Sequence, residues 1–140
     1  MNLDKLKVGR KLNILIAKNV MGWTHWENCN DGDWEGPDDV TFFANFSGEF
    51  GLAVYEPGYD EPTFYFAPST DLQDAWDVVE KMKDKSWLIT IQNCHDKTGH
   101  NYQWCVIMAN NDPESEAVEG MASTVPLAIC LAALKAVGYK

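Results

Sequence analysis

The chain has 140 residues, a net charge of −10 at pH 7 and a hydrophobic content of 46%. This length suits one domain, 1–140, with a sizeable core, and the composition excludes a disordered or collagen-like chain. No apolar run reaches the roughly 18 residues that cross a bilayer. Between Asn19 and Glu80 there is no Lys or Arg, whereas Asp and Glu recur. Because Lys and Arg neutralise nucleic-acid phosphates, we expect no direct nucleic-acid binding.

The basic N-terminal segment predicts a first helix. Apolar residues recur at helical spacing from Leu12 to Met21, and Gly22 follows as a C-terminal stop. Charges interrupt the apolar residues of 1–23 and no small-residue cleavage site is present, so we expect no secretory signal. The four cysteines form no close Cys-x-x-Cys pair. Reduced thiols in a cytoplasmic protein are the simplest interpretation.

Residues 24–62 are rich in aromatic and acidic side chains, and we set them apart as an insertion within the domain. The segments FFANF, FGLAVY and TFYF predict short strands between turns such as EPGYDEP. The acidic segment NDGDWEG, residues 30–36, is similar to the opening of a calcium loop. Such a loop needs a bidentate acid at its twelfth position, which here is Phe42. We therefore expect an acidic turn and no calcium site.

The segment PSTDLQDAWDVVEKM predicts a second helix. Thr70 and Gln73 have the spacing of a capping box at its start. Its expected apolar face comprises Leu72, Ala75, Trp76, Val79 and Met82.

The segment SWLITIQNCHDKTGHNYQWCVIM predicts a β-hairpin that turns in DKTG and precedes an acidic loop, NNDPESEAVEG. Pairing His95 with His100 places both histidines on one sheet face. Cys94 and Cys105 then share the other face, several pairs apart, on the order of 13 Å from the strand rise. Cysteine and histidine are zinc ligands, but this geometry separates them, and we expect no metal.

The segment TVPLAICLAALKAVG predicts a last helix, which starts near Ser123 and Thr124 and ends at Gly138. A core stripe on it comprises Leu127, Cys130, Leu131 and Leu134. A second stripe comprises the small residues Ala128, Ala132 and Ala136. A helix that is apolar on two sides is usually buried on two sides. The small stripe is therefore expected to dock on another element or another subunit, and we predict an oligomer with these alanines at its interface.

Three segments in this order, VMGW, PSTDLQDAWDVVEKM and TVPLAICLAALKAVG, resemble the phage ABA sandwich domain, a family of small proteins encoded by phages and prophages. The resemblance does not extend over residues 25–62. It implies an α/β (α+β) sandwich, in which helices pack on the faces of an antiparallel sheet. The matching residues are apolar, capping or turn residues, so the resemblance implies no catalytic set and no cofactor.

Motifs for catalysis are missing from the sequence, because it contains no G-x-S-x-G, no Walker motif and no G-x-G-x-x-G. We therefore expect no enzyme. Two predicted helix starts, at 69–70 and 123–124, present N–H groups suited to an anion, and aromatic side chains can stack on a base. The candidate ligand-binding residues are Trp23, Trp26, Tyr65, Ser69, Thr70 and Trp104. The competing interpretation is that they are helix caps and core aromatics.

The resemblance implies an accessory protein that acts by binding in the host cytoplasm, since small phage proteins commonly modify host processes or block host defence. One mechanism is inhibition of a host protein, with the acidic surface occupying a basic site. The alternative is an oligomeric sponge that sequesters a small nucleotide-like signal. A structural protein of the phage particle is a further alternative. The charge distribution favours the first.

Overall fold

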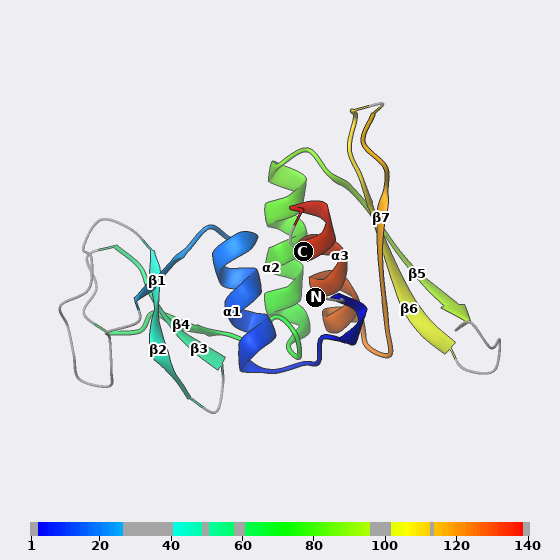
Figure 1. Ribbon diagram of the computed structural model, residues 1–140. Coiled ribbons are helices and arrows are strands. Elements are labelled where there is room, and N and C mark those ends of the chain that lie inside the picture. The colour runs from blue at the N-terminus through cyan, green and yellow to red at the C-terminus, as the bar shows by residue number, and fades with distance from the viewer. Residues whose placement is uncertain are drawn as a thin grey trace.

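The computed structural model describes residues 3–26, 41–48, 51–57, 61–95, 102–112 and 114–138. Three helices form its central layer, and a sheet lies on each side of that layer (Figure 1). The predicted α+β sandwich is confirmed. In one respect the prediction is corrected, because two sheets enclose the helices where a single sheet was expected.

The first sheet has the strand order β1-β2-β3-β4. Its strands are β1 (Thr24–Trp26), β2 (Phe42–Gly48), β3 (Gly51–Tyr55) and β4 (Phe64–Phe66). β1 pairs with β2 in parallel, and the other two pairs are antiparallel. The strands predicted from FFANF, FGLAVY and TFYF are therefore confirmed. Residues 24–26, 42–48 and 51–55 of the segment 24–62 supply three of these four strands and are part of the sandwich.

The second sheet has the order β5-β6-β7, with β5 (Leu88–His95), β6 (Tyr102–Ala109) and β7 (Val118–Ala122) all antiparallel. The predicted hairpin is present, but His95 pairs with Tyr102 and not with His100. This shift of two residues leaves every side chain on its predicted face, because strand side chains alternate with a period of two. The predicted turn, DKTG, lies outside the described residues.

Strand β7 (Val118–Ala122) begins within the segment that the sequence predicts as an acidic loop, so that prediction is wrong for the three residues 118–120. Gly120 lies against the last helix, and Val118 and Ala122 share its face of the sheet and belong to the core. Glu119 is exposed on the opposite face. The alternation spans only five residues, which is too short to stand out beside the preceding acids.

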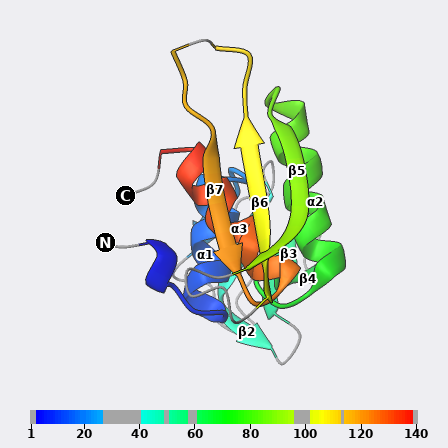
Figure 2. The same ribbon diagram turned by 90° about the vertical axis from the view of Figure 1, so that its right-hand side faces the viewer.

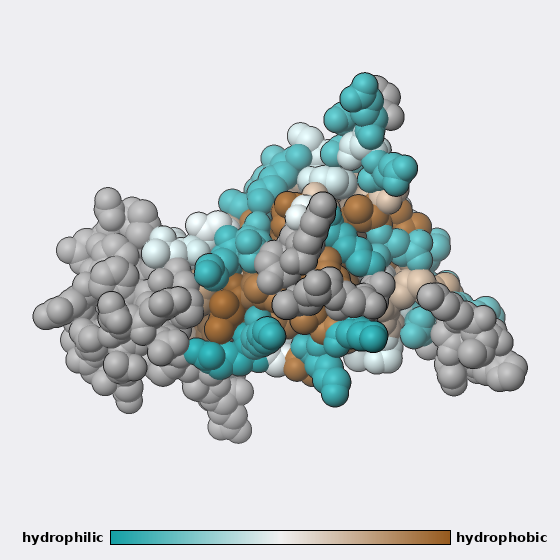
Figure 3. Space-filling model, in the orientation of Figure 1, coloured by the Kyte–Doolittle hydropathy of each residue, from teal (hydrophilic) through white to brown (hydrophobic). Residues whose placement is uncertain are grey.

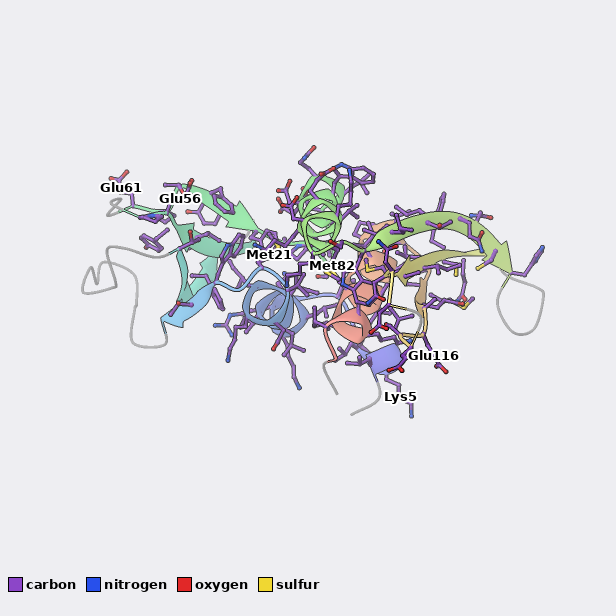
Figure 4. The ribbon with its side chains drawn as sticks, turned by 90° about the horizontal axis from the view of Figure 1, so that it is seen from above. Lys5, Met21, Glu56, Glu61, Met82 and Glu116 are labelled. Carbon is purple, nitrogen blue, oxygen red and sulfur yellow. The ribbon has the colours of Figure 1, made fainter. Side chains whose placement is uncertain are left out.

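The helices are η1 (Leu3–Lys5), α1 (Arg10–Asn19), α2 (Leu72–Asp84) and α3 (Val125–Ala136). The N-cap of α2 is Asp71, whose carboxylate accepts a hydrogen bond from the backbone N–H of Asp74 at 2.9 Å. The N-cap is thus Asp71 and not the predicted Thr70. The reciprocal bond of a capping box is absent here, because the carboxylate of Asp74 accepts from the N–H of Ala67 and the N–H of Asp71 donates to the carbonyl oxygen of Ala67. Seen from above, Met82 lies on the inner side of α2 (Figure 4). Hydrophobic residues of the helical layer also reach the surface on the face that carries both termini (Figure 3).

The small-residue stripe of α3 docks on β7 of the same chain. A Cβ atom on Gly120 would collide with the carbonyl oxygen of Ala128 and would lie 2.5 Å from the backbone nitrogen of Ala132. Ala128 and Ala132 are 0% exposed, so neither can contact a second subunit, and the predicted oligomer interface is corrected for both. Ala136 is half-buried near the end of the helix. Of the helices within the described ranges, none has the length and apolar character to cross a membrane.

Candidate functional site

Three of the aromatic residues predicted to bind a ligand, Trp23, Tyr65 and Trp104, do not face a common site. Trp23 packs edge-to-face on Phe64 and Phe66, with ring centroids 5.6 and 4.8 Å apart, so it joins α1 to the first sheet. Tyr65 lies between those two phenylalanines on β4, and its side chain is therefore directed to the other face. Trp104 belongs to the second sheet, across the helical layer. The side chain of Trp26 lies outside what the structure describes.

Ser69 has a structural role that excludes the predicted anion site. Its side chain is fully buried, and its hydroxyl accepts a hydrogen bond from the backbone N–H of Gly9 at 3.1 Å. Its own N–H donates to the side-chain oxygen of Asn13 at 3.1 Å. The N–H of Thr70 donates to the carbonyl oxygen of Ala67. The two bonds of Ser69 attach the β4–α2 connection to the start of α1, and the prediction for Ser69 is corrected. The side chain of Thr70 is exposed, and its role in ligand binding stays a prediction.

The N-terminus of α2 is occupied by the protein's own carboxylates. Besides the cap made by Asp71, the carboxylate of Asp74 accepts a hydrogen bond from the N–H of Ala67 at 2.9 Å. Burial raises the pKa of Asp74, the Ala67 bond opposes this, and the negative charges of Asp71 and Asp77 raise it further. A helix N-terminus attracts anions, and here that place is filled from within the chain.

The two cysteines of the hairpin are closer together than the sequence predicts. Cys94 pairs with Gln103, and Cys105 pairs with Gln92, so the cysteines are diagonal neighbours on the outer sheet face. Burial raises the pKa of Cys105 to about 11, and Glu119 contributes to the rise. Within the described ranges no group of three or more His, Cys, Asp or Glu is placed to hold a metal ion. Residues 30–36 and His100 lie outside those ranges.

A groove of about 630 Å³ lies between α2 and β5. Figure 2 shows β5 as the strand of its sheet nearest to α2. The lining from α2 comprises Trp76, Val79 and Lys83, and that from β5 comprises Leu88, Ile89 and Ile91. Trp87 from the connection and Asn111 from the β6–β7 loop complete the walls, with Ser86.

The groove presents apolar side chains to solvent. Trp76 is 44% exposed, Leu88 is 67% exposed, and Leu72, one turn before Trp76 on α2, is 57% exposed. The sequence places Leu72 and Trp76 on the buried face of the helix. That prediction is wrong because Ala75, Val78, Val79 and Met82 are the residues of α2 that reach the core.

The comparison with known families covers most of the chain. Residues 14–134 match the family model of the Phage ABA sandwich domain. The chain belongs to this family. Neither a curated protein nor a solved structure gives a significant match. The resemblance seen in three sequence segments is thus confirmed, and the protein is a small phage protein whose matched span includes both sheets, α2 and the groove.

Three exposed acidic side chains are close in sequence to lining residues of the groove in this ABA sandwich domain. Glu80 and Asp84 are exposed on α2 beside its wall, and Asp112 is exposed next to Asn111 in the loop. The only charged side chain of the lining within the described residues is Lys83, and its ammonium lies 3.6 Å from the carboxylate of Glu80. A second acidic region, with Glu56 and Glu61, lies at the outer end of the first sheet (Figure 4). The groove therefore combines apolar walls with an acidic rim.

The groove is the feature that reasoning from the sequence missed. Ser86 has a φ of 72°, a left-handed conformation that non-glycine residues rarely adopt. It lies where the chain passes from α2 into β5, and Trp87 follows it into the groove wall. Helical periodicity has no signal for this change of direction.

Proposed function

We propose that this ABA sandwich domain acts by binding a host protein through its acidic surface, and that it inhibits that protein as a counter-defence factor in the host cytoplasm. The observation that carries the proposal is the α2–β5 groove, where exposed apolar side chains lie inside an acidic rim. The proposal involves no catalysis, no cofactor and no direct contact with nucleic acid.

The composition of the groove supports a protein partner. Protein interfaces concentrate their binding energy in a few aromatic anchors that a more polar rim surrounds. Trp76 and Leu88 have the exposure of such anchors, and covering apolar surface stabilises a complex by roughly 25 cal/mol per Å². Carboxylates on the rim and a net charge of −10 attract basic surfaces and accelerate their association. A basic host protein is the partner that this surface suits.

The second candidate is an oligomeric sponge for a small nucleotide-like signal, and the size of the groove favours it. Sites for small molecules have volumes of roughly 300–1,000 Å³, and the groove falls within this range. Trp76 and Trp87 offer aromatic faces for stacking, and Lys83 is a cation for an anionic group. The acidic rim opposes such a ligand, because a phosphate approaching Lys83 also approaches Glu80.

Native mass spectrometry of the protein purified from host cells, before and after denaturation, tests both candidates. We expect a host protein to copurify with the wild type and with Tyr65→Ala, and to be lost with Trp76→Ala. Tyr65 is a matched control because it is an aromatic residue with 42% exposure on the first sheet. A small molecule released on denaturation would favour the sponge. A bare homo-oligomer would contradict both candidates and favour a role in the phage particle.

A further inference from the structure

We infer that the free edge of β5 and the groove beside it accept an extended, basic and apolar segment of a partner protein, which pairs with β5 as an additional strand. This inference rests on the proposed function, since it specifies how the host protein is bound. It assigns the contact to backbone pairing along β5 and to side chains that enter the groove.

The free edge of β5 lacks the usual protection of an edge strand. Within the described residues β5 pairs with β6 alone, so its other edge carries backbone N–H and C=O groups available to a new strand. Natural edge strands are commonly shortened, or carry Lys, other charges or Pro that prevent pairing with another chain. β5 is eight residues long, reads LITIQNCH, and contains no Lys, Arg, Asp, Glu or Pro.

Helix α2 lies under the position that such a strand would take. Ile89 and Ile91 point to the inner face of the sheet, and they line the groove together with Trp76 and Val79 of α2. A strand added at the edge of β5 would direct every second side chain to the same inner face. Those side chains would enter the groove and contact α2. Strand addition with side-chain pockets beside the edge is an established mode of peptide recognition.

The charges beside the groove specify the partner segment. Side chains on the inner side of the added strand, at the margin of the groove, would approach the exposed carboxylates of Glu80 and Asp84 on α2, and Asp112 is exposed in the adjoining loop. The alternate side chains would point to the outer face of the sheet. Lys83 is already paired with Glu80, so the excess charge of the rim is negative. The complementary segment combines apolar residues with Lys or Arg on the side that faces α2. An acidic segment would bring like charges together.

Selection from a displayed library of random ten-residue peptides on the full-length protein tests this inference. We expect enriched peptides that combine apolar and basic residues, with affinity reduced at least tenfold by Trp76→Ala and several-fold by Glu80→Lys. Tyr65→Ala should leave their affinity unchanged. The inference is overturned if no enriched peptide depends on Trp76, or if the enriched peptides are acidic.

Backbone pairing is tested separately with N-methylated versions of an enriched peptide. An added strand directs alternate N–H groups toward β5, so methylation of one alternate set should abolish binding and methylation of the other set should not. Hydrogen exchange should slow in 88–95 on binding. Tolerance of both methylated sets, or slowed exchange confined to α2, would overturn strand addition.

The two tests distinguish failure of this inference from failure of the proposed function. A host protein that binds the Trp76→Ala variant as tightly as the wild type would leave the inhibitory function standing and overturn the site. If basic peptides bind in the groove but no host protein copurifies from cells, the site is supported and the host-inhibitor function is contradicted.

Discussion

Gly120 lies against the backbone of α3, and replacing it with alanine should destabilise the protein strongly. The added Cβ would collide with the carbonyl oxygen of Ala128 and lie 2.5 Å from the nitrogen and 3.1 Å from the Cα of Ala132. All three atoms belong to the backbone of one helix. Relief therefore requires α3 to move away from β7, and α3 is buried from Ala128 to Leu134.

The size of the effect follows from this geometry. Adding a methyl group to a packed core costs about 1–3 kcal/mol and occasionally more, and a contact with backbone cannot be relieved by a change of rotamer. We expect a loss near the top of that range, about 3 kcal/mol. With an entropy of unfolding of roughly 2.1 cal/mol/K per residue, this lowers Tm by about 10 °C. Such a loss is a large part of a typical stability of about 5–15 kcal/mol.

Urea and thermal unfolding of Gly120→Ala measure the loss. Gly22→Ala is a matched control, because Gly22 has a φ of +75° and open space around it. Left-handed backbone costs a non-glycine residue about 1–2 kcal/mol, so the control should lose less than Gly120→Ala. Adding Ala132→Gly should not rescue Gly120→Ala, since the close atoms are backbone. A variant Gly120→Ala within 1 kcal/mol of the wild type would refute the reasoning.

Three further predictions concern single side chains. Burial raises the pKa of Asp74, so the folded protein binds this proton more tightly than the unfolded chain does. The charged carboxylate therefore lowers stability at pH 7, and Asp74→Asn should raise the urea midpoint there. This gain should shrink as the pH falls towards the ordinary carboxyl pKa of about 4. Iodoacetamide at pH 8 should modify Cys105 about a hundredfold more slowly than an ordinary thiol, because burial raises the pKa of Cys105 from 9.0 to about 11 and the thiolate is the reactive form. Equal rates for Cys105 and for the cysteine of an unstructured peptide, measured by mass spectrometry, would contradict this. Lys85→Met should lower the free energy of unfolding in urea by about 1–2 kcal/mol, because the ammonium of Lys85 donates a hydrogen bond to the carbonyl oxygen of Val20 at 2.9 Å. An unchanged urea midpoint would show that this bond contributes nothing to stability.

Periodicity and capping signals predict the elements well where they are long. The run from Leu12 to Met21 and the segment TVPLAICLAALKAVG both form the expected helices. The hairpin is also predicted, but its register is not, because a shift of two residues preserves both faces. That shift matters chemically, since it turns Cys94 and Cys105 into diagonal neighbours.

The candidate groove was not predictable from the sequence for a tertiary reason. Leu72 and Trp76 fit the apolar stripe of α2, and periodicity alone assigns them to the core. Whether a flank of a helix is covered depends on where the neighbouring sheet ends, and this sheet ends at β5. A free strand edge has no sequence signature of its own. The absence of charge and Pro from LITIQNCH indicates an unprotected edge only once its position is known.

The small-residue stripe of α3 shows how one missed element changes a functional argument. The small side chain of Ala132 predicts that a neighbouring backbone comes close to the helix. The sequence left two alternatives for that neighbour, another element of the same chain or another subunit. The deciding residue is Gly120, on the strand that the sequence reading took for a loop, and it brings β7 onto the helix. The stripe therefore explains packing within one chain. Among the large apolar side chains exposed in the described residues, Trp76 and Leu88 lie in the groove, and a homo-oligomer of this protein stays a prediction.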